Sequence, residues 1–238
     1  ENLRLIEAHR EEAYVTAALL QVAQAVVSAN ELDEVLQNIV DLLPILVGSD
    51  VCVVYLWDPI SKIFRPSQVY ANESRAGRLL LETDYTPSEH ALLDAVLGSG
   101  SIYIAPADEN TVLPERWPLL DVRPLNSLAE SSVLPSDTWL LGFPLTVQDQ
   151  VLGVLVVREP NTTAVFWERR MEIITGIAQQ ASLAIQNDLL KREMVHNERI
   201  EREIQLARQI QETFLPDRLP QPPGWEVDVR WETARQVG

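Results

Sequence analysis

One cysteine and three histidines are the residues of this chain whose types could supply a nucleophile or bind a transition metal. Cys52 lies in the apolar run DVCVVYLWD, a setting typical of a small buried side chain and not of a reactive thiol. His90 falls in the first turn of an expected helix, where a solvated or capping histidine is a simpler interpretation than a haem ligand. His9 and His196 are interpreted as surface residues of terminal helices. The sequence therefore predicts no catalytic residue, metal site or cofactor in this chain.

Four aromatic residues could instead contribute to a site for a small molecule. They flank or lie near residues 106–137, a proline-rich stretch with little periodicity that is expected to be a long loop. Their simplest role is to close the core beneath this loop, and the functional alternative is to form a pocket wall for a flat ligand. Both alternatives concern Tyr103, Trp117, Trp139 and Phe143.

The overall charge narrows the range of partners. The chain has 35 acidic and 19 basic residues and a net charge of −16, which a phosphate backbone or an anionic lipid surface would repel. No apolar run approaches the ~20 residues of a membrane span, and no signal peptide opens the chain. We therefore expect a cytoplasmic protein that binds neither nucleic acid nor membrane.

Two helices are expected in the first half of the chain. A helix is expected over residues 31–48, with Asn30 as its N-cap and with Pro44 bending or interrupting it. A second helix is expected over residues 86–98, because it opens with a Thr-Pro-Ser-Glu capping box and ends at a glycine.

Strand signals lie between and after these helices. The run around Cys52 predicts a strand buried on both faces, and the segment after it reads as a weaker hairpin partner. A second hairpin is expected around the turn Gln148-Asp149. The expected strands cover residues 50–58, 62–70, 101–105, 138–147 and 150–159.

Two long helices are expected near the ends of the chain. The first shows a seam with alternating steps of three and four, and the second runs without a break over about 50 residues from 165 to 215. Half of the seam of the second helix is polar or charged, so we expect a homodimer whose 190–215 segments pair weakly. The seam residues are Leu3, Ile6, Ala13, Ala17 and Leu20 in the first helix, and Leu190, Asn197, Ile200, Ile204, Ala207, Gln211 and Phe214 in the second.

Residues from about 30 to 190 resemble a GAF domain. The strongest matches are GFPLTVQDQVLGVLVVRE and the following FWERRMEIITGIAQQASLAIQNDLL. The resemblance implies an α+β fold, in which an antiparallel sheet of roughly six strands is flanked by helices and extended by long N- and C-terminal coiled-coil helices. One face of the sheet would be covered by the terminal helices, and the other by loops that often enclose a small molecule. The pattern typical of cyclic-nucleotide-binding members is missing, and Cys52 is misplaced for a bilin attachment site.

The end of the chain resembles the entry to a SpoIIE-like (PPM-type) serine phosphatase domain. The matching segments run from Gln211 to Pro216, over Leu219-Pro220, and from Ala234 to Gly238. The resemblance implies that the metal-binding aspartates, with their Mn or Mg ions, would follow beyond Gly238. This chain would then have no activity of its own, and the parent's substrate would be a phosphoserine regulatory protein.

Together the helix patterns and the two resemblances imply a bacterial signalling protein in four parts. Residues 1–29 would be a signalling helix, 30–189 a GAF sensor domain, 190–216 a coiled-coil linker helix, and 217–238 the truncated start of the phosphatase domain. The expected function is to sense a signal, to dimerise, and to relay the signal through the linker to the phosphatase. The alternative is a ligand-free GAF domain that serves only as a structural dimerisation module.

Overall fold

The computed structural model describes residues 31–71, 80–107, 122–125, 138–160 and 164–214, together with positions 17, 20, 222–224 and 228. Leu3, Ile6, Ala13 and Trp117 lie outside the described residues, as does nearly all of the predicted phosphatase start. The chain divides into a unit over residues 1–188 and another over residues 189–238, and each is described by itself. None of the described helices has the length and apolar content needed to cross a membrane.

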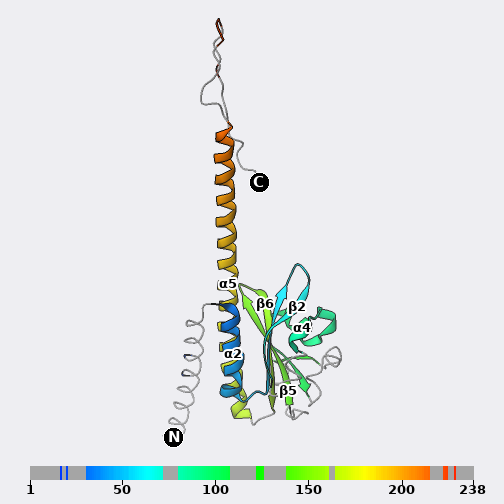
Figure 1. The fold of residues 1–238 in the computed structure, drawn as a ribbon. Coiled ribbons are helices and arrows are strands. Elements are labelled where there is room, and N and C mark those ends of the chain that lie inside the picture. The colour runs from blue at the N-terminus through cyan, green and yellow to red at the C-terminus, as the bar shows by residue number, and fades with distance from the viewer. Residues whose placement is uncertain are drawn as a thin grey trace. The chain divides into compact units, whose positions relative to one another are not determined.

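The first unit is built on a six-stranded sheet in the order β2-β1-β6-β5-β3-β4, in which every paired strand is antiparallel (Figure 1). This confirms the predicted fold class. The two predicted hairpins are the β1–β2 and β5–β6 pairs. The strands are β1 (Val51–Asp58), β2 (Ile63–Ala71), β3 (Tyr103–Ala107), β4 (Arg123–Pro124), β5 (Thr138–Val147) and β6 (Gln150–Pro160).

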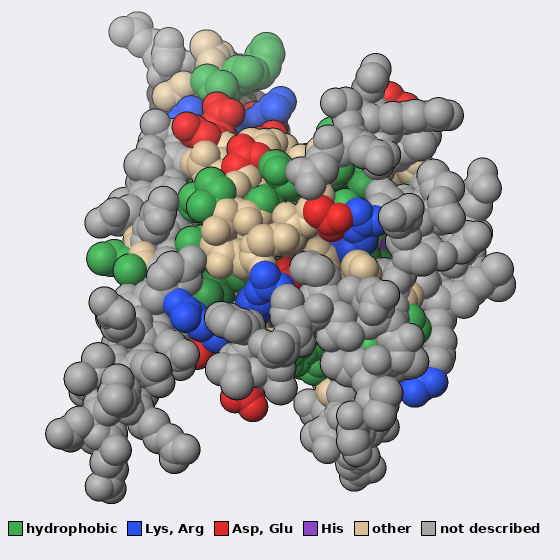
Figure 2. All heavy atoms as spheres, turned by 90° about the horizontal axis from the view of Figure 1, so that it is seen from below, with side chains coloured by type: hydrophobic (Ala, Val, Ile, Leu, Met, Phe, Trp, Pro, Cys, Tyr) green, Lys and Arg blue, Asp and Glu red, His purple; other side chains and the backbone are tan. Residues whose placement is uncertain are grey.

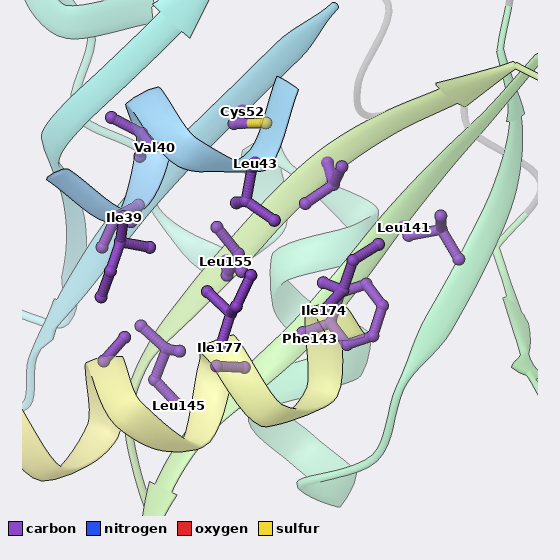
Figure 3. Packing of buried hydrophobic residues seen from close by; sticks show 14 of the residues in the cluster. Ile39, Val40, Leu43, Cys52, Leu141, Phe143, Leu145, Leu155, Ile174 and Ile177 are labelled. Atoms are coloured by element: carbon purple, nitrogen blue, oxygen red, sulfur yellow. The ribbon is translucent and has the colours of Figure 1, made fainter. Parts of the chain in front are cut away.

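Helices cover the two faces of this sheet. The helix α2 (Leu32–Val47) and the first half of α5 (Ala164–Thr213) lie on one face, and α4 (Ala91–Ser99) lies on the other (Figure 1). Figure 3 shows how side chains from α2 and α5 meet those of β1, β5 and β6 in a single apolar layer. We call this layer the helix-side core, and the layer beneath α4 the α4-side core.

Strand alternation assigns each side chain to one of these cores. Along β5, Trp139, Leu141, Phe143 and Leu145 belong to the helix-side core. Along β1, Cys52 and Val54 face the helix side, and Val53 and Tyr55 face α4. Because successive side chains of a strand point to opposite faces, a strand buried on both sides reads as a continuous apolar run.

The α2 helix differs in two details from the prediction. Its N-cap is Glu31 rather than Asn30, and the helix continues through Pro44 without interruption. The buried side chains Val40, Leu43 and Val47 lie on both sides of the proline, so packing outweighs the lost backbone hydrogen bond. Gly48 ends the helix in the left-handed conformation with φ of 75°, as expected.

The segment predicted as one helix over residues 86–98 is split in two. The capping box closes only a short 3-10 turn, η1 (Pro87–Glu89), in which Glu89 Oε2 accepts a hydrogen bond from the Thr86 backbone N–H at 2.7 Å. His90 then takes an extended conformation, with φ of −140° and ψ of 96°, and α4 begins after it. The helix runs past Gly98 and ends at Ser99, with Gly100 as its C-cap.

Two glycines give a matched test of the sheet packing. A Cβ on Gly153 of β6 would collide with the backbone carbonyl oxygen of Tyr55, whereas a Cβ on Gly98 of α4 would meet nothing within 4 Å. We expect Gly153→Ala to lower the free energy of unfolding by about 1–3 kcal/mol. Gly98→Ala should raise it by up to about 1 kcal/mol, since alanine is the better helix former.

Urea denaturation of both variants measures these changes. Equal stability of the G153A variant and the wild type would show that β1 and β6 are not in such close contact.

Candidate functional site

Three polar aromatic side chains meet inside the α4-side core, and they form the candidate site. The ring centroid of Tyr55 lies 5.9 Å from that of Tyr85 and 6.3 Å from that of His90. The rings of Tyr85 and His90 are 5.6 Å apart, and all three pairs meet edge to face. Tyr55 and His90 are 0% exposed, and Tyr85 is 3% exposed. We call this group the Tyr55–Tyr85–His90 cluster.

Each member of the cluster comes from a different local structure. Tyr55 faces α4 because of the alternation along β1. Tyr85 is held by a bridge to Phe64, in which the Phe64 N–H donates to the Tyr85 carbonyl at 2.7 Å and the Tyr85 N–H donates back at 2.9 Å. His90 is itself the residue with extended backbone between η1 and α4. The strand β1 and the segment 85–90, which lie about 30 residues apart in the sequence, therefore converge on one point.

Burial keeps all three side chains uncharged. It raises the pKa of the Tyr55 phenol well above the usual 10.0, and the nearby Tyr85 adds to this effect. It raises the pKa of Tyr85 to about 12, although a hydrogen bond with Thr83 acts in the opposite direction. It lowers the pKa of His90 from 6.5 to about 3. At neutral pH the cluster thus offers hydroxyl and imidazole groups that can form hydrogen bonds without carrying charge.

The interpretation of His90 as a solvated side chain is wrong. Its backbone is the N-cap of α4, but its imidazole makes no capping hydrogen bond and is fully buried. The sequence shows the capping box before it and does not show that the chain turns inward after one short turn. The contact with Tyr55 and Tyr85 depends on tertiary structure, so no local pattern could have revealed it.

Three of the four predicted pocket aromatics are described by the structure, and they do not all lie on one face of the sheet. Trp139 and Phe143 are buried in the helix-side core, and Tyr103 is half-buried against the α4-side core on the other face of the sheet. Alternation along β5 accounts for the separation. Ligand binding by Tyr103, Trp117, Trp139 and Phe143 stays a prediction.

Cys52 is the small buried side chain that the sequence predicted. It belongs to the helix-side core, and its Sγ lies 3.0 Å from Oγ of Ser49, with which it forms a hydrogen bond. Burial raises the pKa of its thiol, the opposite of what a nucleophile requires. In the part of the chain that the structure describes, no three His, Cys, Asp or Glu side chains gather as a metal site.

The linker part of α5 presents its predicted seam to solvent in the single chain. Leu190, Ile200 and Phe214 are exposed, Phe214 by 82%, and Ile204 is half-buried. Asn197, Ala207 and Gln211 are exposed as well. On the same segment, Arg199 pairs with Glu203 at 2.9 Å and Arg202 pairs with Glu198 at 3.1 Å, an i,i+4 spacing that supports an exposed helix.

Comparison with known proteins decides the family. The sequence profile of the GAF domain matches residues 31–187, well over half of the 238 residues. The chain belongs to the GAF domain family. GAF domains are sensor and signalling modules of bacterial proteins. A search of curated proteins found no match.

Solved GAF domains share the fold at low sequence identity. One is the GAF domain of a phosphoenolpyruvate-protein phosphotransferase from Coxiella burnetii, with a TM-score of 0.55, 17% identity, and 76% of this chain and 98% of that chain covered. Its Acinetobacter counterpart has a TM-score of 0.53 and 21% identity, over 72% and 92% of the two chains. The phycocyanobilin-bound GAF domain of a cyanobacterial phytochrome has a TM-score of 0.51 and 16% identity, over 74% and 96%.

The burial of His90 in this GAF domain can be tested by the pH dependence of the unfolding free energy. Because its pKa is lowered in the folded state, its contribution to stability is present above pH 6.5 and is lost as the pH falls towards 3. His90→Leu removes this loss. We expect the unfolding free energy of the variant, relative to the wild type, to rise by about 2 kcal/mol between pH 7 and pH 5.

Urea denaturation at the two pH values gives the difference, and His196→Leu, at an exposed position of α5, is the control. The control should show no such rise. A constant difference between the H90L variant and the wild type would contradict the burial of an uncharged histidine.

Proposed function

We propose that this chain is the sensor and dimerisation module of a bacterial signal-transduction protein. In this proposal the GAF domain registers a signal in the Tyr55–Tyr85–His90 cluster. The signal passes through α5 to a metal-dependent protein-serine phosphatase domain. The observation that carries the proposal is α5, a helix of 50 residues that contributes to the core of the domain and continues into an exposed segment.

The first half of α5 is well placed to register a change in the sheet. Ile173, Ile174, Ile177 and Ala181 are buried in the helix-side core, where they pack with the side chains of β1, β5 and β6 (Figure 3). Close-packed interiors transmit small displacements instead of absorbing them. A shift of the strands would therefore move the helix.

The strand β1 connects the candidate site to this core. Tyr55 faces the cluster, and its neighbour Val54 faces α2 and α5. A ligand or other signal that moved Tyr55 would move Val54 with it, because the two share one peptide unit. This arrangement supports a relay from one face of the sheet to the other.

The phosphatase assignment rests on the resemblance of the last segment of the chain. In a PPM-type domain, Mn or Mg ions activate the water that attacks the phosphoserine ester. We expect the 238-residue chain to show no turnover of p-nitrophenyl phosphate with Mn. In this proposal, a longer protein that carries the metal-binding aspartates of such a domain should show Mn-dependent turnover and should dephosphorylate a phosphoserine protein. Activity of the shorter chain, or inactivity of the longer one, would contradict the assignment.

A purely structural role as a ligand-free dimerisation module is the second candidate. The full burial of Tyr55 and His90 favours it, because neither side chain is open to a ligand from solvent. Native mass spectrometry of the protein from cells separates the two roles. A retained small molecule favours the sensor, and an empty domain in every preparation favours the structural module.

Both roles require a parallel homodimer, which the seam of α5 makes testable. Asn197 and Gln211 occupy seam positions and would weaken the pair. We expect Asn197→Ile combined with Gln211→Ile to lower the dimer dissociation constant at least tenfold in sedimentation equilibrium. The matched control changes Gln205 and Gln209, which are exposed residues off the seam, to isoleucine.

The control variant should dissociate like the wild type. A wild-type chain that stays monomeric at micromolar concentration, or an equal gain in the control, would contradict the parallel seam.

A further inference from the structure

A carboxyl group lies buried where the sheet leads into α5. Glu159, near the end of β6, is 0% exposed and shares the helix side of the strand with Leu155 and Val157. Its Oε2 accepts a hydrogen bond from Nη1 of Arg170 at 2.9 Å, and the Arg170 side chain is 20% exposed. The pair joins β6, the last strand in the sequence, to an early turn of α5, which we call the output helix because the proposed signal leaves the domain through it. Figure 2 views the molecule from below the orientation of Figure 1 and shows acidic and basic side chains next to one another on that surface, whereas Glu159 itself is buried.

The buried carboxyl group is only partly satisfied. Within the described residues, its Oε1 has no hydrogen-bond partner, and the same is true of Nε1 of Trp139. Trp139 is the residue paired with Glu159 across β5 and β6, and it is 3% exposed. An ionised carboxylate has about four acceptor sites, so a single donor leaves its charge poorly solvated. The neutral carboxyl group loses less hydration free energy on burial than the ionised one does.

The other charged and titratable groups near Glu159 do little to help the ionised form. From the start of β1, Asp50 adds negative charge, although Asp50 is itself bound by Arg158 through the guanidinium Nε at 2.8 Å and through Nη2. The Cys52 thiol is held near its neutral form by burial. From α2 comes Gly48, whose missing side chain leaves room for Arg170.

We propose that Glu159 is a proton-operated latch on the output helix: its neutral form holds the base of α5 against the sheet, and its ionised form loosens that contact. The latch goes beyond the proposed relay, because it acts through acidity and requires no ligand in the Tyr55–Tyr85–His90 cluster. It would let the same helix respond to the pH around the protein.

The direction of the effect follows from proton linkage. Burial raises the pKa of Glu159 from 4.5 to about 7, against the lowering effect of Arg170, and Asp50 adds to the rise. Opening of the helix base would return the carboxyl group to water and to its ordinary pKa. The closed state is therefore fully favoured below pH 4.5 and loses that advantage as the pH rises through 7. Between pH 6 and pH 8 the opening equilibrium should increase about tenfold.

Amide hydrogen exchange of the 238-residue chain tests the latch. The readout is the protection of amides in residues 164–180, divided by their intrinsic exchange rates at each pH. The wild type should lose about tenfold in protection between pH 6 and pH 8. Glu159→Gln keeps the shape and stays uncharged, so its protection should change less than about twofold.

Two further variants make the test specific. Glu172→Gln is the same substitution at an exposed position of α5 and should behave like the wild type. Arg170→Met removes the positive partner, so the loss of protection should move to higher pH. A wild type without pH-dependent protection, or an E159Q variant that keeps the dependence, would overturn the latch. If E159Q does not fold, an R170M midpoint equal to that of the wild type would overturn it as well.

Discussion

The central strands β1 and β6 bury both of their faces, and the other elements of the domain have their places because each face must be covered. The helix side is closed by α2 and α5, which contribute Leu36, Ile39, Leu43, Ile174 and Ile177 to the core. The opposite side is closed by α4 with Leu92, Leu93 and Val96. Because water is excluded from both layers, any polar group within them must stay neutral or find a partner.

The buried polar groups follow this constraint in different ways. Tyr55, Tyr85 and His90 stay uncharged because burial shifts each pKa away from neutrality. Glu159 has a positive partner in Arg170, yet burial still brings its pKa to about 7. The domain thus places a group that titrates near neutrality at the end of β6, in contact with Arg170 of α5, and groups that do not titrate there in the α4-side core.

Much of the fold could be predicted from the sequence, because strong local patterns encode it. Two apolar runs on either side of Gln148 and Asp149 predict the β5–β6 hairpin. The positive φ values of these two residues, 48° and 65°, suit a tight two-residue turn. The length of α5 follows from an unbroken helical pattern. The resemblance to GAF domains predicted a sheet of roughly six antiparallel strands, which the structure confirms.

The candidate site could not be predicted in the same way. Its members meet only after β1, the Phe64–Tyr85 bridge and the start of α4 are in place. Glu159 was hidden for a similar reason, because a glutamate at the end of an apolar run reads as solvated. Its burial depends on Trp139 and on Arg170, which lie on other elements. Trp139 and Phe143 were grouped with Tyr103 by their closeness to one loop, whereas alternation separates them.

One position in β5 carries a consequence for how such domains diverge. A Cβ on Gly142 would come within 2.9 Å of Cγ2 of Val96 and 3.1 Å of Cγ of Leu92, so α4 sits against bare backbone there. A larger residue there would require α4, or the side chains of Val96 and Leu92, to shift. A substitution at this one position would therefore alter the packing of α4 on β5 while Tyr55, Tyr85 and His90 stay the same.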